Sequence, residues 1–163
     1  MQNVAGASGS NPVTFGSYGT GRATISERGR NEGCYVYRMG GIVIRDLNFT
    51  GPGLATANVE GIKLLNDVAS KVYPYVRITN CTVTGHVQGI YIQSSVNASG
   101  YSDVRITGCN ANANVRNGIL MDGVEYGSFN FFNVYVGYCT AYNNPGLAAP
   151  AQSYGERDSV KLH

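Results

Sequence analysis

The sequence predicts an all-β solenoid, a right-handed parallel β-helix of about five coils. Two observations predict it: apolar and polar residues alternate with period two in many short segments, and these segments recur about every 28 residues. The composition agrees, because Gly, Asn, Thr, Val, Ile and Tyr favour turns and strands over long helices. A chain of 163 residues has the length of one domain, so we expect residues 1–163 to form a single β-helix domain.

The first recurring segment is a strand that runs into a polar turn. Its four copies are residues 42–51, 76–85, 104–113 and 134–143. The steps from Val76 to Val104 and from Val104 to Val134 each match the repeat length to within two positions. The step from Ile42 to Val76 is longer, which an insertion at residues 52–58 explains as a loop bulging from one coil.

The second recurring segment is a short strand opened by glycine. Its copies are Gly61-Ile-Lys-Leu, Gly89-Ile-Tyr-Ile and Gly118-Ile-Leu-Met, with Gly33-Cys-Tyr-Val as a degenerate earlier copy and Ser159-Val-Lys-Leu as a later one. Cys34, Ile62, Ile90 and Ile119 follow one another at the same repeat length, to within one position. The much longer step from Ile119 to Val160 indicates a second loop at residues 145–154.

The alternation predicts which residues of the first segment point inward. They are Ile42, Ile44, Leu47 and Phe49, then Val76, Ile78, Cys81 and Val83, then Val104, Ile106, Cys109 and Ala111, and finally Val134, Val136, Cys139 and Ala141. One repeat cannot bury its apolar face alone, but equivalent residues stacked about 4.8 Å apart form a continuous core. Each strand should therefore pair in parallel with its copy in the next coil.

Two other folds use many short strands. An antiparallel β-sandwich does not require equivalent residues at a fixed repeat length, so the repeat argues against it. A leucine-rich repeat protein would carry a leucine-dense consensus, which is absent from this sequence.

Composition and charge exclude several classes of function. The net charge of +2 is far from the strongly basic face of a nucleic-acid binder, so we expect no nucleic-acid partner. A membrane-spanning helix needs about 20 consecutive apolar residues, and no segment approaches that, so we expect no membrane span. The first ten residues are small and polar and do not form a signal peptide.

The segment Asn11-Pro-Val-Thr-Phe-Gly-Ser-Tyr-Gly-Thr-Gly-Arg-Ala-Thr-Ile25 resembles the entry segment of bacterial right-handed β-helix proteins of the pectin-lyase-like superfamily. The Val-Arg-Ile-Thr and Gly-Ile-x-Ile copies and the turn Tyr142-Asn-Asn-Pro-Gly146 are similar to repeats and turns of the same group. The resemblance implies a carbohydrate-linked domain that is secreted or on the cell surface. It would be a polysaccharide lyase, hydrolase or epimerase, or else a non-catalytic adhesin or tailspike module, or an inactive fragment.

The sequence shows no amphipathic capping segment before the first coil or after the last. We therefore expect a partial domain with open end coils. Unpaired strand edges associate readily, so self-association through the coil ends is a further expectation.

Cysteine and asparagine are expected to have structural roles. Cys81, Cys109 and Cys139 occupy one inward position, as small apolar side chains with poor geometry for disulfides, and Cys34 belongs to the second core column. No His, Asp or Glu shares the first column, so we expect no metal there. The asparagines expected at turns are Asn80, Asn110, Asn112, Asn143 and Asn144.

Function would lie at outward positions. Arg77, Arg105 and Tyr135 form one outward column, which suits a strip binding the carboxylates of uronic acids; alternatively the arginines pair with loop acids such as Asp103. Along the second segment an exposed column is expected, and its members are Tyr35, Lys63, Tyr91, Leu120 and Lys161. The site residues predicted for substrate binding are Arg77, Arg105, Tyr135, Lys63 and Tyr91.

The candidates for catalysis are few. Asp122, Lys161 and Asp158 come together in the proposed register, with Glu156 and His163 nearby, and could support acid and base chemistry. The same acids could hold Ca²⁺, although no calcium-binding nonapeptide repeat is present, so no cofactor is predicted. Polysaccharide remains the expected partner.

Overall fold

The computed structural model describes residues 7–27, 31–123, 130–146 and 160–162. Of residues 160–162 it describes the backbone only. In these residues the chain is all β, and its strands form three parallel sheets of five. Sheet B holds β1 (Val13–Gly16), β4 (Ile42–Arg45), β7 (Val72–Thr79), β10 (Gly100–Thr107) and β13 (Phe132–Gly137). Sheet C holds β2 (Ala23–Ser26), β5 (Leu47–Thr50), β8 (Thr82–Thr84), β11 (Asn110–Asn112) and β14 (Thr140–Tyr142). Sheet A holds β3 (Cys34–Tyr37), β6 (Ile62–Asn66), β9 (Ile90–Ser94), β12 (Ile119–Gly123) and β15 (Val160–Leu162).

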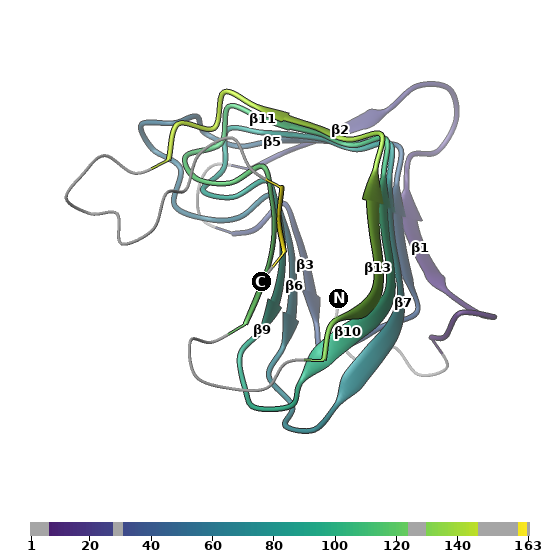
Figure 1. The fold of residues 1–163 in the computed structure, drawn as a ribbon. Coiled ribbons are helices and arrows are strands. Elements are labelled where there is room, and N and C mark those ends of the chain that lie inside the picture. Colours follow the sequence, from purple (N-terminus) through teal and green to yellow (C-terminus); the bar gives the residue numbers. More distant parts are fainter. Residues whose placement is uncertain (1–6, 28–30, 124–129, 147–159, 163) are drawn as a thin grey trace.

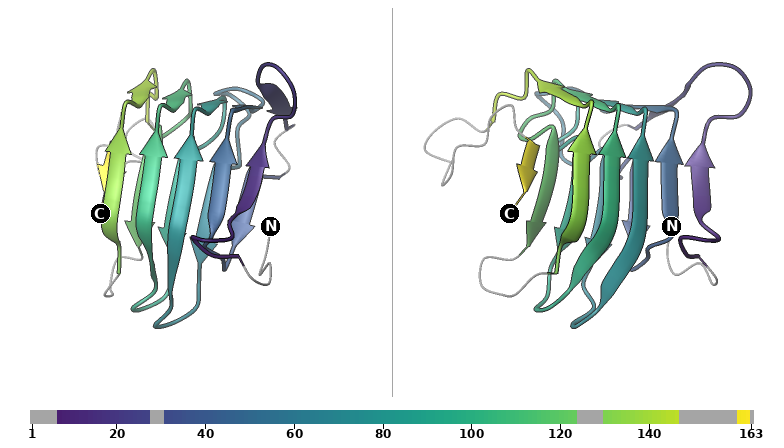
Figure 2. Two further views of the ribbon diagram at one scale, coloured as in Figure 1. Left: turned by 90° about the vertical axis from the view of Figure 1, so that its right-hand side faces the viewer. Right: turned by 45° about the vertical axis from the view of Figure 1, so that its right-hand side comes forward.

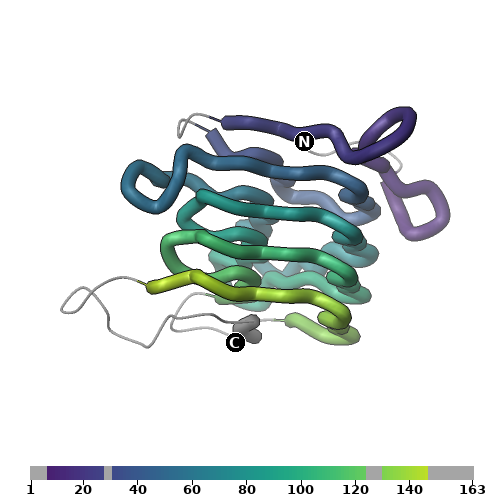
Figure 3. Tube along the Cα trace, turned by 90° about the horizontal axis from the view of Figure 1, so that it is seen from above, coloured from purple at the N-terminus to yellow at the C-terminus, as the bar shows by residue number. Residues whose placement is uncertain are grey.

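The chain visits sheets B, C and A in turn and then starts again, which makes a β-solenoid. Seen along its length, sheets A and B lie on opposite sides and sheet C bridges them (Figure 1). The five strand triplets are related by about four turns of the chain, and they stack in order from the N-terminus to the C-terminus (Figures 2 and 3). The predicted parallel β-helix architecture is confirmed.

The register confirms the repeat that the sequence predicted. Val76 of β7 pairs with Val104 of β10, and Val104 pairs with Val134 of β13. Across the two irregular spacings the pairing also holds, because Ile42 pairs with Val76 and Ile119 pairs with Val160. The insertions therefore leave the strand ladder intact.

The predicted inward residues form the core. In the coils that begin with β4, β7 and β10, each of them is at most 2% exposed. In the coil that begins with β13, Val134, Val136 and Cys139 are half-buried and pack against that core. Cys81, Cys109 and Cys139 lie in successive coils as predicted, and the backbone N–H of Cys109 donates to Cys139 Sγ at 3.4 Å.

Single residues with positive φ turn the chain from sheet B into sheet C. They occupy one stacked position in four coils: Asp46 (φ 57°), Asn80 (φ 54°), Gly108 (φ 62°) and Tyr138 (φ 56°). The predicted turn role is confirmed for Asn80 and also for Asn143, whose φ is 54°. It is wrong for Asn110 and Asn112, which belong to strand β11.

A ladder of buried side chains lines the corner between sheets C and A; we call His86, Asn114 and Asn144 the corner ladder, and each is 0% exposed. Asn114 Oδ1 accepts from the His86 backbone N–H at 3.1 Å, and Asn144 Oδ1 accepts from the Asn114 N–H at 2.9 Å. The amides also donate inward, Asn114 Nδ2 to Val83 O at 3.2 Å and Asn144 Nδ2 to Ala111 O at 3.1 Å. Asn144 thus joins adjacent coils through its buried side chain, whereas its predicted turn role stays a prediction.

Candidate functional site

The substrate-binding residues predicted from the sequence lie on two surfaces. Arg77, Arg105 and Tyr135 stand on the outer face of sheet B, and their register places them in neighbouring strands. Lys63 and Tyr91 are neighbours in sheet A, on the opposite side of the solenoid (Figure 1). The five residues therefore cannot line one site, and each surface has to be judged separately.

On sheet B the arginines are engaged with their own coil neighbours. Arg77 Nη2 donates to Asp103 Oδ2 at 2.7 Å, and its guanidinium carbon lies 4.0 Å from the centroid of the Tyr75 ring. Arg105 Nη2 donates to Asn133 Oδ1 at 2.8 Å and lies 3.4 Å from Asp103 Oδ1.

These contacts to Asp103 match the alternative prediction from the sequence, in which the two arginines pair with a loop acid. One carboxylate lies between two guanidinium groups and relieves the repulsion that adjacent like charges would cause. Much of their hydrogen-bonding capacity is used within the protein, so the surface offers little free charge to a uronic acid. Tyr135, next to Arg105 in register, is 46% exposed.

A more varied set of side chains lies on sheet A, and we call it the tyrosine face. It consists of Tyr35, Tyr37, Arg38, Lys63 and Asp67, together with Glu32 and Glu60. The rings of Tyr35 and Tyr37 stack, with centroids 5.8 Å apart and planes inclined by 28°. Both tyrosines are on β3 with side chains pointing outward, because the alternate residues Cys34 and Val36 fill the core.

A hydrogen-bonded network fixes one end of the tyrosine face. The Tyr37 hydroxyl donates to Asp67 Oδ2 at 2.7 Å, and Arg38 Nη2 donates to the same oxygen at 2.9 Å. The Arg38 guanidinium also lies 4.6 Å from the centroid of the Tyr37 ring. Arg38 lowers the pKa of Asp67 to about 2, and the hydrogen bond to Asp67 raises the pKa of Tyr37. Asp67 therefore stays charged and Tyr37 stays protonated over the whole neutral range.

At the other end, two carboxylates share one ammonium group. Lys63 Nζ lies 3.3 Å from Glu60 Oε2 and 3.9 Å from Glu32 Oε1. All three side chains are largely buried, with Glu60 16% and Lys63 19% exposed. Cys34 pairs with Ile62, so Glu32 and Glu60 stand at equivalent places in adjacent coils, with their backbones about 4.8 Å apart along the solenoid.

The two glutamates had a sequence signal that the prediction did not use. Each immediately precedes the glycine that opens the second recurring segment, and they lie one full repeat apart. Gln88 and Asn117 occupy the same place in the next two coils and are buried. A column of Glu, Glu, Gln and Asn could thus have been read directly from the repeat.

Part of the predicted exposed column is covered. Tyr91 is 7% exposed and Leu120 is 6% exposed, so the prediction that they face solvent is wrong. The alternation of a strand shows which side chains leave the core, but it does not show whether another segment covers them. Lys63 Nζ lies 5.8 Å from the centroid of the Tyr91 ring, so the buried Tyr91 ring lies next to the tyrosine face.

The catalytic candidates from the sequence lie at the far end of sheet A. Asp122 is half-buried on β12 and pairs in register with Gln93, and Lys161 of β15 pairs with Leu120. Asp158, Glu156 and His163 lie outside the described residues. The grouping of Asp122, Lys161 and Asp158 stays a prediction.

Neither a membrane-spanning helix nor a cluster of metal ligands is found among the described residues. None of their segments forms a helix long and apolar enough to cross a membrane. Within the same residues, no three or more His, Cys, Asp or Glu side chains gather where they could hold a metal ion.

Comparison with protein-family models, with curated proteins and with solved structures gives no match to this chain. The resemblance to the pectin-lyase-like superfamily therefore stays a prediction from the sequence. The structure itself establishes an all-β parallel solenoid with two chemically distinct outer faces.

Proposed function

We propose that this protein binds a glycan along the outer face of sheet A, centred on the tyrosine face. The observation that carries the proposal is the stacked pair Tyr35 and Tyr37, flanked by charged groups on both sides. Tyrosine offers an apolar ring for a sugar face and a hydroxyl for hydrogen bonding. The carboxylates and cations next to the rings are paired with one another, which fixes the rings in place, and the remaining lone pairs of the carboxylates can accept hydrogen bonds from sugar hydroxyls.

The charges of the tyrosine face favour a neutral glycan. Its two cations are outnumbered by three carboxylates, namely Glu32, Glu60 and Asp67. A polyuronate would bring further negative charge to a surface that already holds a net negative charge, and that repulsion weakens binding. The expected ligand is therefore an uncharged oligosaccharide.

The change Tyr37→Ala tests the proposal. We expect binding of a neutral oligosaccharide, selected on a glycan array, to weaken about tenfold in a calorimetric titration, because the outward ring that contacts the sugar is lost. Tyr37→Phe keeps the ring and should stay within about threefold of the wild type. Tyr135→Ala removes an exposed tyrosine from sheet B and should leave the affinity unchanged.

Two results would contradict this assignment. One is an array on which acidic glycans bind and neutral glycans do not. The other is an equal loss of affinity in Tyr37→Ala and Tyr135→Ala, which would mean that the glycan does not distinguish sheet A from sheet B.

A second candidate function, glycoside hydrolysis, rests on Glu32 and Glu60. Glycosidases use two carboxylates, and a separation of about 5 Å is typical of the retaining mechanism. Glu32 Oε1 and Glu60 Oε2 lie 3.9 Å and 3.3 Å from Lys63 Nζ, so these two oxygens are no more than about 7 Å apart, a range that includes the retaining separation. In this scheme one glutamate attacks the anomeric carbon while the other protonates the leaving oxygen, and the second glutamate then takes a proton from a water molecule that releases the sugar from the first.

The change Glu60→Gln distinguishes hydrolysis from binding alone. If the protein is a hydrolase, neutral polysaccharide incubated with the wild type should gain reducing ends, and Glu60→Gln should lower that rate by at least about a hundredfold. Asp46→Asn, at the turn from sheet B into sheet C, is the control and should keep the rate. Absence of new reducing ends with the wild type would leave glycan binding as the function and remove the hydrolase.

A further inference from the structure

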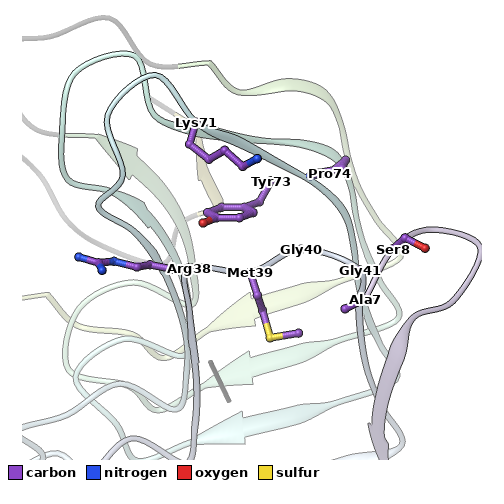
Figure 4. Close-up of a pocket in the computed structure, with 9 residues that line it drawn as sticks. All are labelled: Ala7, Ser8, Arg38, Met39, Gly40, Gly41, Lys71, Tyr73 and Pro74. Carbon is purple, nitrogen blue, oxygen red and sulfur yellow. The ribbon is translucent and has the colours of Figure 1, made fainter. Parts of the chain in front are cut away.

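A hollow of about 380 Å³ lies where the chain passes from sheet A to sheet B, between the turn at residues 38–41 and the beginning of β7 (Figure 4). Its volume is at the lower end of the range for small-molecule sites, about 300–1,000 Å³. It therefore suits a ligand built around a single ring.

Close backbone packing forms the walls of the hollow. A Cβ at Gly40 would lie only 2.1 Å from Pro74 O, so only glycine allows the two turns to approach so closely. A Cβ at Gly41 would similarly lie 2.3 Å from Ser8 N, which shows how tightly the N-terminal segment closes one side. The shape thus depends on fixed backbone and is present without a ligand.

The lining is mainly apolar. Met39 is 3% exposed, and Figure 4 shows its side chain below the ring of Tyr73. The Tyr73 ring rests on the buried Tyr101 ring, with centroids 6.2 Å apart, and Tyr101 in turn stacks on Phe131 at 6.4 Å. This aromatic column holds Tyr73 in place, so the hollow presents a rigid flat surface.

One cation is available at the rim. Lys71 is exposed, and its Nζ lies 5.5 Å from the centroid of the Tyr73 ring. In the part of the chain that the structure describes, no carboxylate forms an ion pair with Lys71. Arg38 also borders the hollow, but its guanidinium is paired with Asp67 and points away from Tyr73 in Figure 4.

We propose that this hollow binds a small organic carboxylate with a flat apolar body. The body lies against Tyr73 and Met39, and the carboxylate pairs with the Lys71 ammonium. A sugar does not fit this description, because an apolar lining would leave its hydroxyls without partners. The ligand is therefore of a different class from the glycan proposed for the tyrosine face, although Arg38 borders both sites.

Benzoate is the probe for the first experiment, in an NMR titration that follows the Met39 methyl and the ring protons of Tyr73. We expect a saturable shift of these signals with benzoate. Benzamide has the same shape without the charge and should bind at least tenfold more weakly. Acetate has the charge without the ring and should also bind at least tenfold more weakly.

Substitutions locate the charge. Lys71→Met should weaken benzoate binding at least tenfold, whereas Lys71→Arg should stay within about threefold. Arg45→Gln removes one cation from the exposed surface of sheet B, so it matches the loss of net charge in Lys71→Met and should not change binding. The methyl spectrum of each variant shows whether its core is still that of the wild type.

Three outcomes would overturn the proposal. The first is the absence of a saturable shift at Met39 and Tyr73. The second is equal binding of benzoate and benzamide, which would remove the role of Lys71. The third is an equal loss in Lys71→Met and Arg45→Gln, which would indicate general attraction to net charge.

Discussion

Replacing Asn114 by alanine should lower the free energy of unfolding by about 4 kcal/mol, the larger of the two strongest effects expected here. Asn114 is 0% exposed. Its side chain connects its own coil to the preceding one, by accepting from the His86 N–H, and to the following one, by donating to Asn144 Oδ1. Alanine would leave the His86 N–H without its acceptor and Val83 O without the Nδ2 donor. Each buried polar group that loses its partner costs about 1–3 kcal/mol, and the substitution leaves two such groups at this corner.

Urea denaturation followed by circular dichroism measures this change. Asn110→Ala is the control, since Asn110 is half-exposed on β11 and its side chain accepts a hydrogen bond from Asn112 on the same surface. It should lose less than about 1 kcal/mol. A similar loss in both variants would mean that the corner ladder adds nothing beyond an ordinary surface contact.

The strand register could be predicted from the sequence because a solenoid repeats one solution in every coil. An inward position that holds Ile44, Ile78 and Ile106 in turn has a single physical explanation, which is burial against the equivalent residue above and below. A shift by one residue would expose the whole column, so the alternation also determines the register. The predicted register also holds across the insertions, because an inserted loop projects from a solenoid without changing how its strands pair.

The corner ladder could not be predicted in this way. Asparagine is common at turns for local reasons, and the sequence gives no sign that Asn114 and Asn144 point inward while Asn143 turns the chain. The corner lies between two strands, where period two no longer applies. His86 stands in the same ladder although its chemistry differs, so comparing residue types would not have matched it to the two asparagines.

For the candidate sites, the sequence predicted where each side chain lies in the strand register better than it predicted which segments cover it. It placed Arg77 and Arg105 in one column and named Asp103 as a pairing partner, and these contacts are present. It could not predict that Tyr91 is covered, because cover comes from segments distant in the chain. The hollow at Lys71 could not be predicted from the sequence either, since its walls come from two turns and the N-terminal segment.

Acidification should destabilise the protein through His86, by about 3 kcal/mol between pH 6.5 and pH 4. The imidazole is 0% exposed, and burial lowers the pKa of His86 to about 4, while the nearby Phe49 backbone and the Glu60 carboxylate act in the opposite direction and are outweighed. Glu27 also faces it, with Oε1 3.3 Å from His86 Nδ1. In the unfolded chain, histidine takes up a proton near pH 6.5.

Between those two pKa values the unfolded state binds a proton that the folded state does not. The contribution of neutral His86 is therefore complete above pH 6.5 and is lost as the pH falls towards 4. His86→Asn tests this, because asparagine already occupies the equivalent ladder positions 114 and 144 and does not titrate. Urea unfolding at pH 7, 6, 5 and 4 should show the wild type losing about 3 kcal/mol more than His86→Asn over that range. Parallel pH profiles for the two proteins would mean that folding leaves the pKa of His86 unchanged, with attraction to Glu27 offsetting the effect of burial.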